Sequence, residues 1–291
     1  MIKVSIELSE QETKDVEDFL YEIAPSPWII IQNQITKNSI LEGFFDTREK
    51  LDSYLSKLDN SSRESLKVNG EYNLENLEDC VWEEAYKIHF EPWQYQGFHW
   101  VPSWCMEDYE CNGDELCLSI DPGMAFGTGQ HETTRMCLEE LVDISKLDRK
   151  KSLLDLGCGS GIIAITAALL GYNHIVAIDN DPDATRISKD NAIKNEVHSI
   201  EFINTSLEEL NAVGQFDIIF ANIQADVLIN YSEIICSFMK NGGTLVLSGI
   251  LKTELEKVNE YYSQQIMKTP RLEKLSVTSK FLNEWGLIKI S

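Results

Sequence analysis

The chain has 291 residues, of which 43% are hydrophobic, and its formal net charge is −23 at pH 7. This length fits one large domain or two unequal domains, and the hydrophobic fraction is enough for a folded core. The excess of acidic residues argues against a broad nucleic-acid-binding surface, which needs clustered Lys and Arg. It is compatible with a basic protein partner, or with solubility alone.

The first residues, MIKVSIELSE, lack the basic segment and the apolar segment of a signal peptide. The most apolar run, residues 161–171, is too short to cross a bilayer. Cys105, Cys111 and Cys117 are spaced C-x5-C-x5-C, which matches no common zinc site. We therefore expect a cytoplasmic protein with reduced cysteines, no metal and no membrane partner.

Residues 1–76 are predicted to form a small ferredoxin-like α+β domain. Ser9 and Glu12 have the spacing of a capping box and mark the start of its first helix. The order β-α-β-β-α-β is that of the split βαβ unit. Strands are expected at 2–8, 28–34, 40–46 and near 68–74, and a second helix at 48–58. Residues 77–110 are predicted to be a connector, with a helix over 78–90.

Residues 111–291 are predicted to form an α/β domain with a doubly wound parallel sheet. Its strands are continuously apolar, which is typical of strands buried on both faces. Strands are expected at 152–157, 174–179, 200–206, 216–223 and 244–250, followed by two strand-like segments at the carboxyl end. Helices are expected from Ile162 and over 184–195, 225–240 and 252–265.

The loop after the first of these strands is rich in glycine and follows an acid: Asp155-Leu-Gly157-Cys-Gly159-Ser-Gly161. Glycines allow the backbone to approach a ligand at the carboxyl end of a sheet. Asp179 ends the next strand, 22 residues after Gly157, where an acid can hydrogen-bond ribose hydroxyls. The segment therefore predicts a nucleotide-type cofactor site.

Two cofactors and a structural turn are the candidate explanations for this loop. A dinucleotide site needs G-x-G-x-x-G, but Ile162 stands at the third glycine position. Asp155 would repel a phosphate and suits a ligand with an ammonium group. The pattern D-x-G-x-G-x-G with a strand-end acid resembles the S-adenosylmethionine (SAM) site of the Rossmann-like methyltransferases. NAD binding and a purely structural glycine turn are the alternatives.

The segment FDIIFANIQAD (216–226) places Asn222 at the tip of the fourth strand. Amine and amide methyltransferases often carry Asn-Pro-Pro-Tyr here, and its Asn oxygen accepts a hydrogen bond from the target nitrogen. This chain has Asn-Ile-Gln-Ala at 222–225. A helix-capping Asn is the alternative. Because it accompanies the glycine motif, we predict a catalytic role for Asn222.

Four segments together resemble the ribosomal-protein-L-eleven methyltransferases, the PrmA family. They are DPGMAFGTGQHETT (121–134), LDLGCGSG (154–161), AIDNDP (177–182) and ANIQAD (221–226). The likeness extends to residues 81–104, which are similar to the family's interdomain region, and so covers the whole chain. The AFGTG-x-H part is more specific than the glycine motif shared by many methyltransferases.

The resemblance implies a SAM-dependent protein methyltransferase that modifies lysine or N-terminal amines of ribosomal protein L-eleven, with residues 1–76 binding that protein. It implies a lid over SAM that runs from Phe126, Gly127 and Thr128 to His131. It implies Thr134, Gly157 and Asp179 as SAM contacts, with Asn222 at the methyl-transfer end. The chain departs from the family pattern at Gln130, Glu132 and Gln224. A family member that methylates a lysine of a different protein is therefore the alternative.

Overall fold

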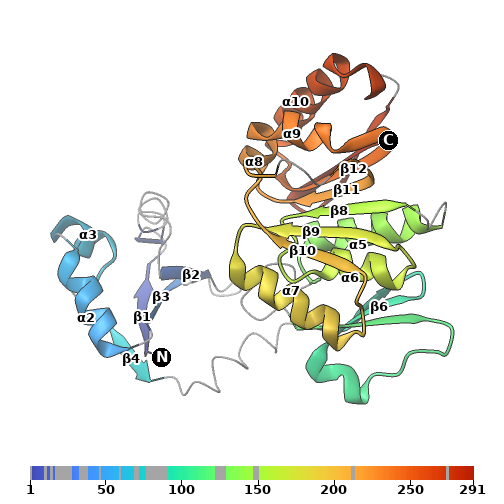
Figure 1. The fold of residues 1–291 in the computed structure, drawn as a ribbon. Coiled ribbons are helices and arrows are strands. Elements are labelled where there is room, and N and C mark those ends of the chain that lie inside the picture. Colours follow the sequence, from blue (N-terminus) through green and yellow to red (C-terminus); the bar gives the residue numbers. More distant parts are fainter. Residues whose placement is uncertain are drawn as a thin grey trace. The chain divides into compact units, whose positions relative to one another are not determined.

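The computed structural model describes residues 2–9, 12–13, 16, 28–32, 39–45, 47–58, 60–68, 72–76, 91–121, 129–146, 151–210, 214–272 and 275–291. The chain divides into two compact units, Met1–Ile88 and His89–Ser291 (Figure 1). Within the described residues, the first unit contains one sheet and the second unit contains two. No helix among the described residues is long and apolar enough to span a membrane.

The first unit contains a four-stranded antiparallel sheet in the order β2-β3-β1-β4. Its elements are β1 (Ile2–Leu8), β2 (Trp28–Gln32), β3 (Ser39–Phe45), α2 (Arg48–Lys57), α3 (Asn60–Ser65) and β4 (Asn73–Asn76). Alternate residues of β3 are buried, as expected for a sheet with one face on a core. The central position of β1, between β3 and β4, agrees with the predicted ferredoxin-like order.

The capping box at the start of the first expected helix is confirmed. The Ser9 backbone N–H donates to Glu12 Oε2 at 3.0 Å, and the Glu12 N–H donates to Ser9 Oγ at 3.4 Å. Glu12, Thr13 and Val16 are helical, and the remainder of that helix lies outside the described residues. The helix expected over 78–90 also lies outside them.

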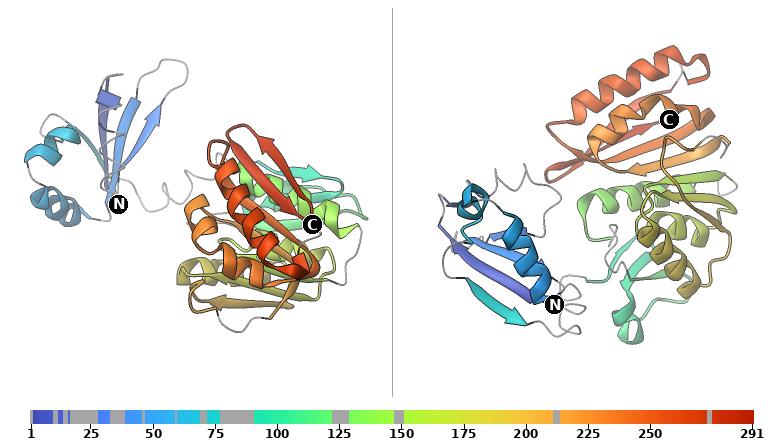
Figure 2. Two further views of the ribbon diagram at one scale, coloured as in Figure 1. Left: turned by 90° about the horizontal axis from the view of Figure 1, so that it is seen from above. Right: turned by 60° about the vertical axis from the view of Figure 1, so that its left-hand side comes forward.

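The second unit is built on a seven-stranded sheet in the order β10-β9-β8-β11-β12-β14-β13. The first five of these strands are parallel to one another, and β14 runs antiparallel to them, next to β12. The edge strand β13 is antiparallel to β14 and so has the direction of the first five. The strands are β8 (Ser152–Leu156), β9 (His174–Asp179), β10 (Ile200–Asn204), β11 (Phe216–Asn222), β12 (Met239–Leu251), β13 (Val277–Leu282) and β14 (Trp285–Ile290). The predicted Rossmann-like, doubly wound sheet is confirmed (Figure 2).

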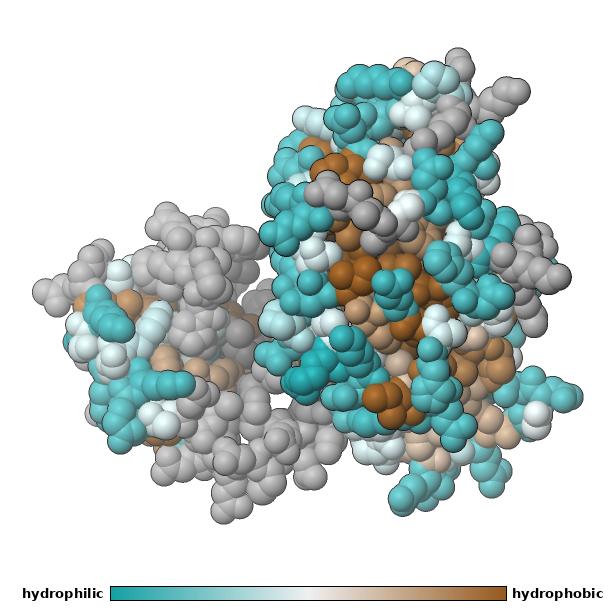
Figure 3. Space-filling model, in the orientation of Figure 1, coloured by the Kyte–Doolittle hydropathy of each residue, from teal (hydrophilic) through white to brown (hydrophobic). Residues whose placement is uncertain are grey.

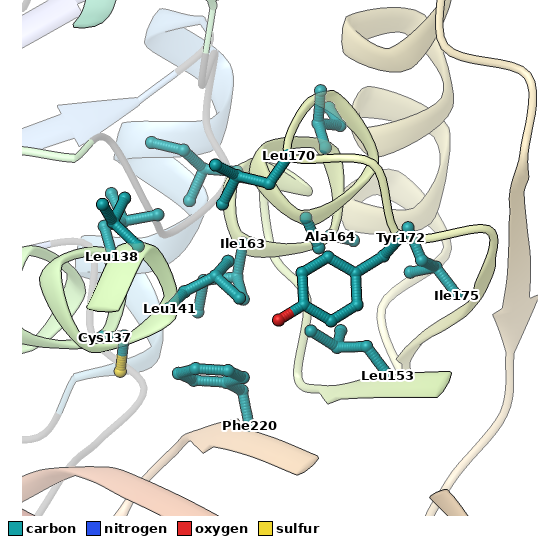
Figure 4. Packing of buried hydrophobic residues seen from close by; sticks show 14 of the residues in the cluster. Cys137, Leu138, Leu141, Leu153, Ile163, Ala164, Leu170, Tyr172, Ile175 and Phe220 are labelled. Atoms are coloured by element: carbon teal, nitrogen blue, oxygen red, sulfur yellow. The ribbon is translucent and has the colours of Figure 1, made fainter. Parts of the chain in front are cut away.

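Helices cover both faces of this sheet. They are α5 (Glu132–Ser145), α6 (Ile162–Leu169) and α7 (Pro182–Lys194) on one face, and α8 (Ala225–Asn230), α9 (Ser232–Ser237) and α10 (Leu255–Lys268) on the other. Successive strand residues face opposite layers: Leu153 joins the core on the α5–α7 side and Leu154 the core on the α8–α10 side. Figure 4 shows the first core, where Leu141, Ile163 and Phe220 lie close together. This double burial explains the continuously apolar strands.

Residues 91–120 form a small three-stranded sheet within the second unit, where the sequence predicts a connector up to residue 110. Its strands are β5 (Trp93–Tyr95), β6 (Phe98–Pro102) and β7 (Leu116–Ile120), with the short helix η2 (Ser103–Asp108) after β6. The Trp100 indole N–H donates to Thr166 Oγ1 at 2.9 Å, which fastens this sheet to α6. The sequence contains little indication of these strands, because all three are short. In addition, every residue of β6 is buried, so it lacks the alternation of apolar and polar residues by which a half-buried strand is recognised.

Two further elements differ from their predicted extent. The single helix expected over 225–240 is two short helices that meet at Tyr231, and β12 already begins at Met239. The two carboxyl-terminal strands form a tight hairpin around Asn283, which has a left-handed φ of 52°. Asn tolerates that conformation better than most residues, so the turn falls there and shifts both strands.

Candidate functional site

A cavity of about 700 Å³ lies where the strand order reverses between β8 and β11. In open α/β sheets, ligands bind at such a reversal, outside the carboxyl ends of the strands. Its volume is within the usual range for small-molecule sites. It is lined by His131, Thr133, Leu156, Gly157, Gly159, Ile178, Asp179, Asn180, Thr205, Ser206, Leu207, Glu208, Asn222, Ile223, Gln224, Val227, Tyr231, Gly249 and Trp285.

The glycine loop forms one wall of this cavity. Gly157 donates its N–H to Ile178 O at 2.8 Å and has a φ of +72°. A Cβ on Gly157 would lie 2.3 Å from Ile223 Cγ2. Gly161 caps α6 with a φ of +80° and faces Ser188. Both positions need glycine, because of the positive φ and the close neighbours.

Asp179 fastens the glycine loop at the end of β9. Its Oδ2 accepts a hydrogen bond from the Gly159 N–H at 2.9 Å, and its Oδ1 accepts one from the Asp181 N–H at 3.0 Å. Asp179 also lines the cavity. The carboxylate therefore lies beside the backbone that a ligand in the cavity would contact.

Asp155 lies beneath the loop and is 1% exposed. Its Oδ2 accepts a hydrogen bond from the Ala164 N–H at 3.2 Å, and its Oδ1 has no hydrogen-bond partner among the described residues. Burial, with a smaller effect from the charge of Asp179, raises the pKa of Asp155 to about 7, although the Ala164 hydrogen bond acts in the opposite direction. A nearby cation would favour the ionised form of this carboxyl group.

Asn222 ends β11 and is joined to the first turn of α5. Its Nδ2 donates to Thr134 Oγ1 at 3.3 Å. Its Oδ1 is buried and has no hydrogen-bond partner in the described part of the chain. The Ser248 hydroxyl, on β12, donates to Thr133 O at 3.2 Å. The first turn of α5 is thus attached to the ends of two adjacent strands.

His131 and Trp285 form the part of the cavity wall nearest the carboxyl-terminal hairpin. His131 is the N-cap of α5, and its Nδ1 accepts a hydrogen bond from the Thr133 N–H at 3.3 Å. The two rings pack edge to face, with centroids 4.9 Å apart. The side-chain amide of Asn283, in the turn of that hairpin, donates a hydrogen bond to Glu132 Oε1 at 2.9 Å. Glu132, one of the residues that depart from the family pattern, is not among the residues that line the cavity.

The cavity brings together many of the residues predicted from the sequence. His131, Gly157, Gly159, Asp179 and Asn222 all line it. The predicted residues Asp155, Gly161 and Thr134 lie behind its wall, and Phe126, Gly127 and Thr128 lie outside the described residues, so the lid stays a prediction.

Several lining residues were not predicted from the sequence. Thr205 to Glu208 follow β10, and the rule that placed Asp179 at a strand end would also have indicated them. Tyr231 donates a hydrogen bond to the Glu208 carboxylate across the cavity. Trp285 comes from the carboxyl-terminal hairpin, and its local sequence carries no signal for the site. Among the described residues, no group of three His, Cys, Asp or Glu side chains is placed to hold a metal ion.

Comparisons with known proteins show the family of the chain. The model of the family "Ribosomal protein L11 methyltransferase (PrmA)" matches residues 2–276. A curated ribosomal protein L11 methyltransferase of Photobacterium profundum is 38% identical over 229 residues, which cover 78% of this chain and 75% of that protein. One from Methylobacillus flagellatus is 36% identical over 265 residues, covering 90% and 84%. The crystal structure of a ribosomal protein L11 methylase from Lactobacillus delbrueckii subsp. bulgaricus superposes with a TM-score of 0.60 at 27% identity, covering 69% of this chain and 98% of that one.

Proposed function

This chain belongs to the ribosomal protein L11 methyltransferase family, and we propose that it transfers methyl groups from SAM to lysine or N-terminal amines of ribosomal protein L11. The observation that carries the proposal is a pair of buried, unpartnered oxygens on either side of the strand reversal. They are Asp155 Oδ1 and Asn222 Oδ1, neither with a hydrogen-bond partner among the described residues. Buried acceptors without donors are costly, so a ligand that supplies a donor fits Asn222 Oδ1, which lines the cavity. Asp155 lies behind the wall, where a positively charged ligand would favour its ionised form.

The residues of the cavity fit SAM better than a dinucleotide. SAM carries an ammonium group, which suits a buried carboxyl such as Asp155. Among the described residues, the cavity lining includes no Lys or Arg that would repel this group. Gly157 and Gly159 would let the backbone approach the ligand, and the Asp179 carboxylate would accept hydrogen bonds from ribose hydroxyls. Thr134 would act through Asn222, whose amide it already contacts. When bound, SAM supplies an electrophilic methyl group.

The chain's own task is to orient the target amine and to exclude water. The attacking nitrogen must be neutral. A lysine with an ordinary pKa near 10.4 is neutral only about one part in 2,500 at pH 7, whereas an α-amine near 7.7–8 costs only about 1 kcal/mol. Asn222 Oδ1 would accept a hydrogen bond from that amine. A buried apolar surrounding lowers a lysine pKa and so assists the reaction.

We propose that residues 1–76 bind the protein substrate and that residues 111–291 carry the methyl-transfer site. The small antiparallel sheet of the first unit has its own core and none of the residues that line the cavity. Removing residues 1–75 should leave SAM binding unchanged and abolish methylation of the protein. A truncated enzyme that still methylates L11 at the full rate would overturn this division of labour.

Mass spectrometry of ribosomal protein L11 from the same organism, incubated with the enzyme and SAM, tests the proposed function. Mass gains in methyl steps at lysine or N-terminal amines are expected. Calorimetric titration with SAM runs in parallel and reports on the cofactor separately. SAM binding without any gain on L11 would support the alternative, a family member that acts on another protein. No binding and no gain would refute the cofactor site itself.

A further inference from the structure

The hairpin formed by β5 and β6 contacts the chain immediately before α5, and this contact lies behind the cavity wall. Trp93, on β5, stacks on Trp100 of β6 with ring centroids 4.2 Å apart and an interplanar angle of 18°. Trp100 is 1% exposed and hydrogen-bonded to Thr166 of α6. The Trp93 ring is therefore held by the core and is not an independent surface group.

Trp93 closes one side of a narrow space around Gly129. Gly129 is buried and has a φ of +82°. A Cβ on it would lie 3.3 Å from Trp93 Nε1 and 3.0 Å from Ile162 Cδ1. Ile162 is the first residue of α6, directly after the glycine loop. Residue 129 thus lies between the hairpin and the helix that follows the glycine loop.

One hydrogen bond and one cation–π contact join the same short segment to Trp93 and to Glu91, just before the hairpin. The Gln130 side-chain amide donates a hydrogen bond to Glu91 O, and Arg135 Nη2 donates to Gln130 Oε1 at 3.4 Å. The Arg135 guanidinium lies over the Trp93 ring, 4.9 Å from its centroid. A cation over an indole face is a favourable contact. Gly129 and Arg135 therefore both lie against the Trp93 ring, and Gln130 is hydrogen-bonded to Arg135 between them.

The segment held in this way carries part of the cavity wall. His131 and Thr133 line the cavity, and Thr134 contacts Asn222. We propose that Trp93 is a positioning residue for methyl transfer: its indole holds Gly129 against Ile162 and so sets the place of His131 and Thr133 relative to the glycine loop. Trp93 itself is not among the cavity-lining residues, so it acts only through the segment. The inference rests on the proposed function for its catalytic consequence.

The test compares Trp93→Ala with Tyr95→Ala in the full-length protein. Tyr95 is the matched control because it is also a partly buried aromatic of β5 packed on the same core. Its hydroxyl donates to Asp143 Oδ2 at 3.2 Å, near the far end of α5 from the cavity. Small displacements at a reacting site cost up to about 100-fold in rate, so kcat/KM for SAM should fall by about 10- to 100-fold in Trp93→Ala only. Thermal unfolding temperature should fall in both variants.

SAM affinity, measured by calorimetry, separates failure of this inference from failure of the proposed function. If the wild-type enzyme binds SAM but leaves L11 unmodified, the proposed substrate is wrong, and weaker SAM binding in Trp93→Ala still supports the inference. Equal SAM affinity and equal kcat/KM in Trp93→Ala and Tyr95→Ala would overturn it.

Gly129→Ala provides a second route, and the single variant alone does not depend on a folded Trp93→Ala protein. The added methyl group would press on both Trp93 and Ile162, so SAM affinity should fall in the single variant. With Trp93→Ala also present, the extra loss due to Gly129→Ala should be smaller, because the indole no longer opposes the methyl group. Strictly additive losses, or a Gly129→Ala variant with wild-type affinity, would contradict the proposal.

Discussion

Asn222 Nδ2 and Thr134 Oγ1 are 3.3 Å apart and join the carboxyl end of β11 to the first turn of α5. This bond fixes the orientation of the Asn222 amide, because its nitrogen is occupied and its oxygen is left without a partner among the described residues. A hydrogen-bond acceptor fixed in this way costs no reorganisation when a donor arrives. The pair therefore connects the segment before α5 to the end of the cavity where we place the amine.

Replacing Asn222 should reduce methyl transfer far more than SAM binding. In Asn222→Ala the proposed acceptor for the target amine is lost, and removal of one preorganised polar group typically lowers kcat by about 100- to 1,000-fold. Single-turnover methylation of L11 and calorimetric SAM titration measure the two effects separately. Thr134→Val is the control, since it removes the bond to Asn222 Nδ2 but keeps the side-chain shape. The methylation rate should fall less in Thr134→Val than in Asn222→Ala. An equal fall would show that the effect comes from the attachment to α5 and not from the Asn222 oxygen.

Asp155 should make the ligand-free protein less stable as the pH rises. The pKa of Asp155 increases from 3.8 to about 7 on folding, mainly through burial, so the folded state holds a proton that the unfolded state releases. The contribution of this proton to the free energy of unfolding is therefore fully present below about pH 4. It is lost as the pH rises to about 7, and the loss is at most about 4 kcal/mol. The side chain introduced in Asp155→Asn does not titrate. The free energy of unfolding of this variant, relative to that of the wild type, should therefore increase as the pH rises from about 4 to about 7.

Urea unfolding without SAM, at intervals between pH 4 and 8, measures that difference. Groups remote from residue 155 titrate equally in both proteins, so the difference between the two curves reports on Asp155 and the groups that interact with it. Parallel curves would show that Asp155 binds its proton equally in the folded and unfolded states. A difference that closes when SAM is added would indicate that a cation compensates the buried charge, as the proposed site requires.

The sequence predicts the parts of the site that follow from strand ends. Gly157, Asp179 and Asn222 could be placed together because the carboxyl ends of adjacent parallel strands meet at one edge. Trp285 could not, since it reaches the cavity through an antiparallel hairpin whose register depends on the turn at Asn283. Tyr231 could not be predicted as a lining residue either, because the sequence predicts one continuous helix over 225–240. In the structure this segment is two helices that meet at Tyr231.

The same physical limit applies to the fold. Long apolar strands buried between two helical layers are visible in the sequence, whereas the strands β5 to β7 are too short and too uniformly buried to show a period. The contact between Trp93 and Gly129 joins residues 36 positions apart, in two segments that the sequence had assigned to different parts of the molecule. Tertiary contacts of this kind are not encoded in any local pattern.

Asp217 should stabilise the second unit at neutral pH and lose this effect in acid. Burial opposes ionisation of this carboxyl group, but hydrogen bonds from Lys240 and from the Ser152 backbone and hydroxyl outweigh it and lower the pKa to about 2. The contribution is present above about pH 4 and disappears as the pH falls towards 2. Because the pair is partly exposed to solvent, Lys240→Met should cost only about 1 kcal/mol at pH 7.

Unfolding curves of the wild type and of Lys240→Met at pH 7 and pH 2.5 test whether the stabilising contribution of Asp217 decreases in acid. The difference between the two proteins should shrink at the lower pH, where Asp217 begins to take up a proton. Lys194→Met is the matched control, since Lys194 pairs with Asp121 at 3.4 Å and is about as exposed as Lys240. A difference for Lys240→Met that grows in acid would contradict the assigned role of Asp217.

Gly157→Ala and Gly242→Ala separate backbone strain from damage to the cavity. The two glycines have nearly equal φ values, +72° and +70°, so an alanine at either should cost about 1–2 kcal/mol of stability. Around Gly242 no atom of the described residues lies within 4 Å of an added Cβ, whereas at Gly157 the Cβ would lie 2.3 Å from Ile223 Cγ2. Ile223 directly follows Asn222 and lines the cavity, so it must move in Gly157→Ala.

We expect Gly157→Ala to lose at least about tenfold in SAM affinity, or about 1.4 kcal/mol, while Gly242→Ala keeps the wild-type value. Calorimetric titration gives the affinities and urea unfolding gives the stabilities of the same preparations. A lower affinity in Gly157→Ala, with a stability loss at least as large as that of Gly242→Ala, would attribute the effect to the close approach of Ile223, because the positive φ is common to both positions. If both variants bind SAM like the wild type, the glycine loop does not form the wall against which the cofactor lies.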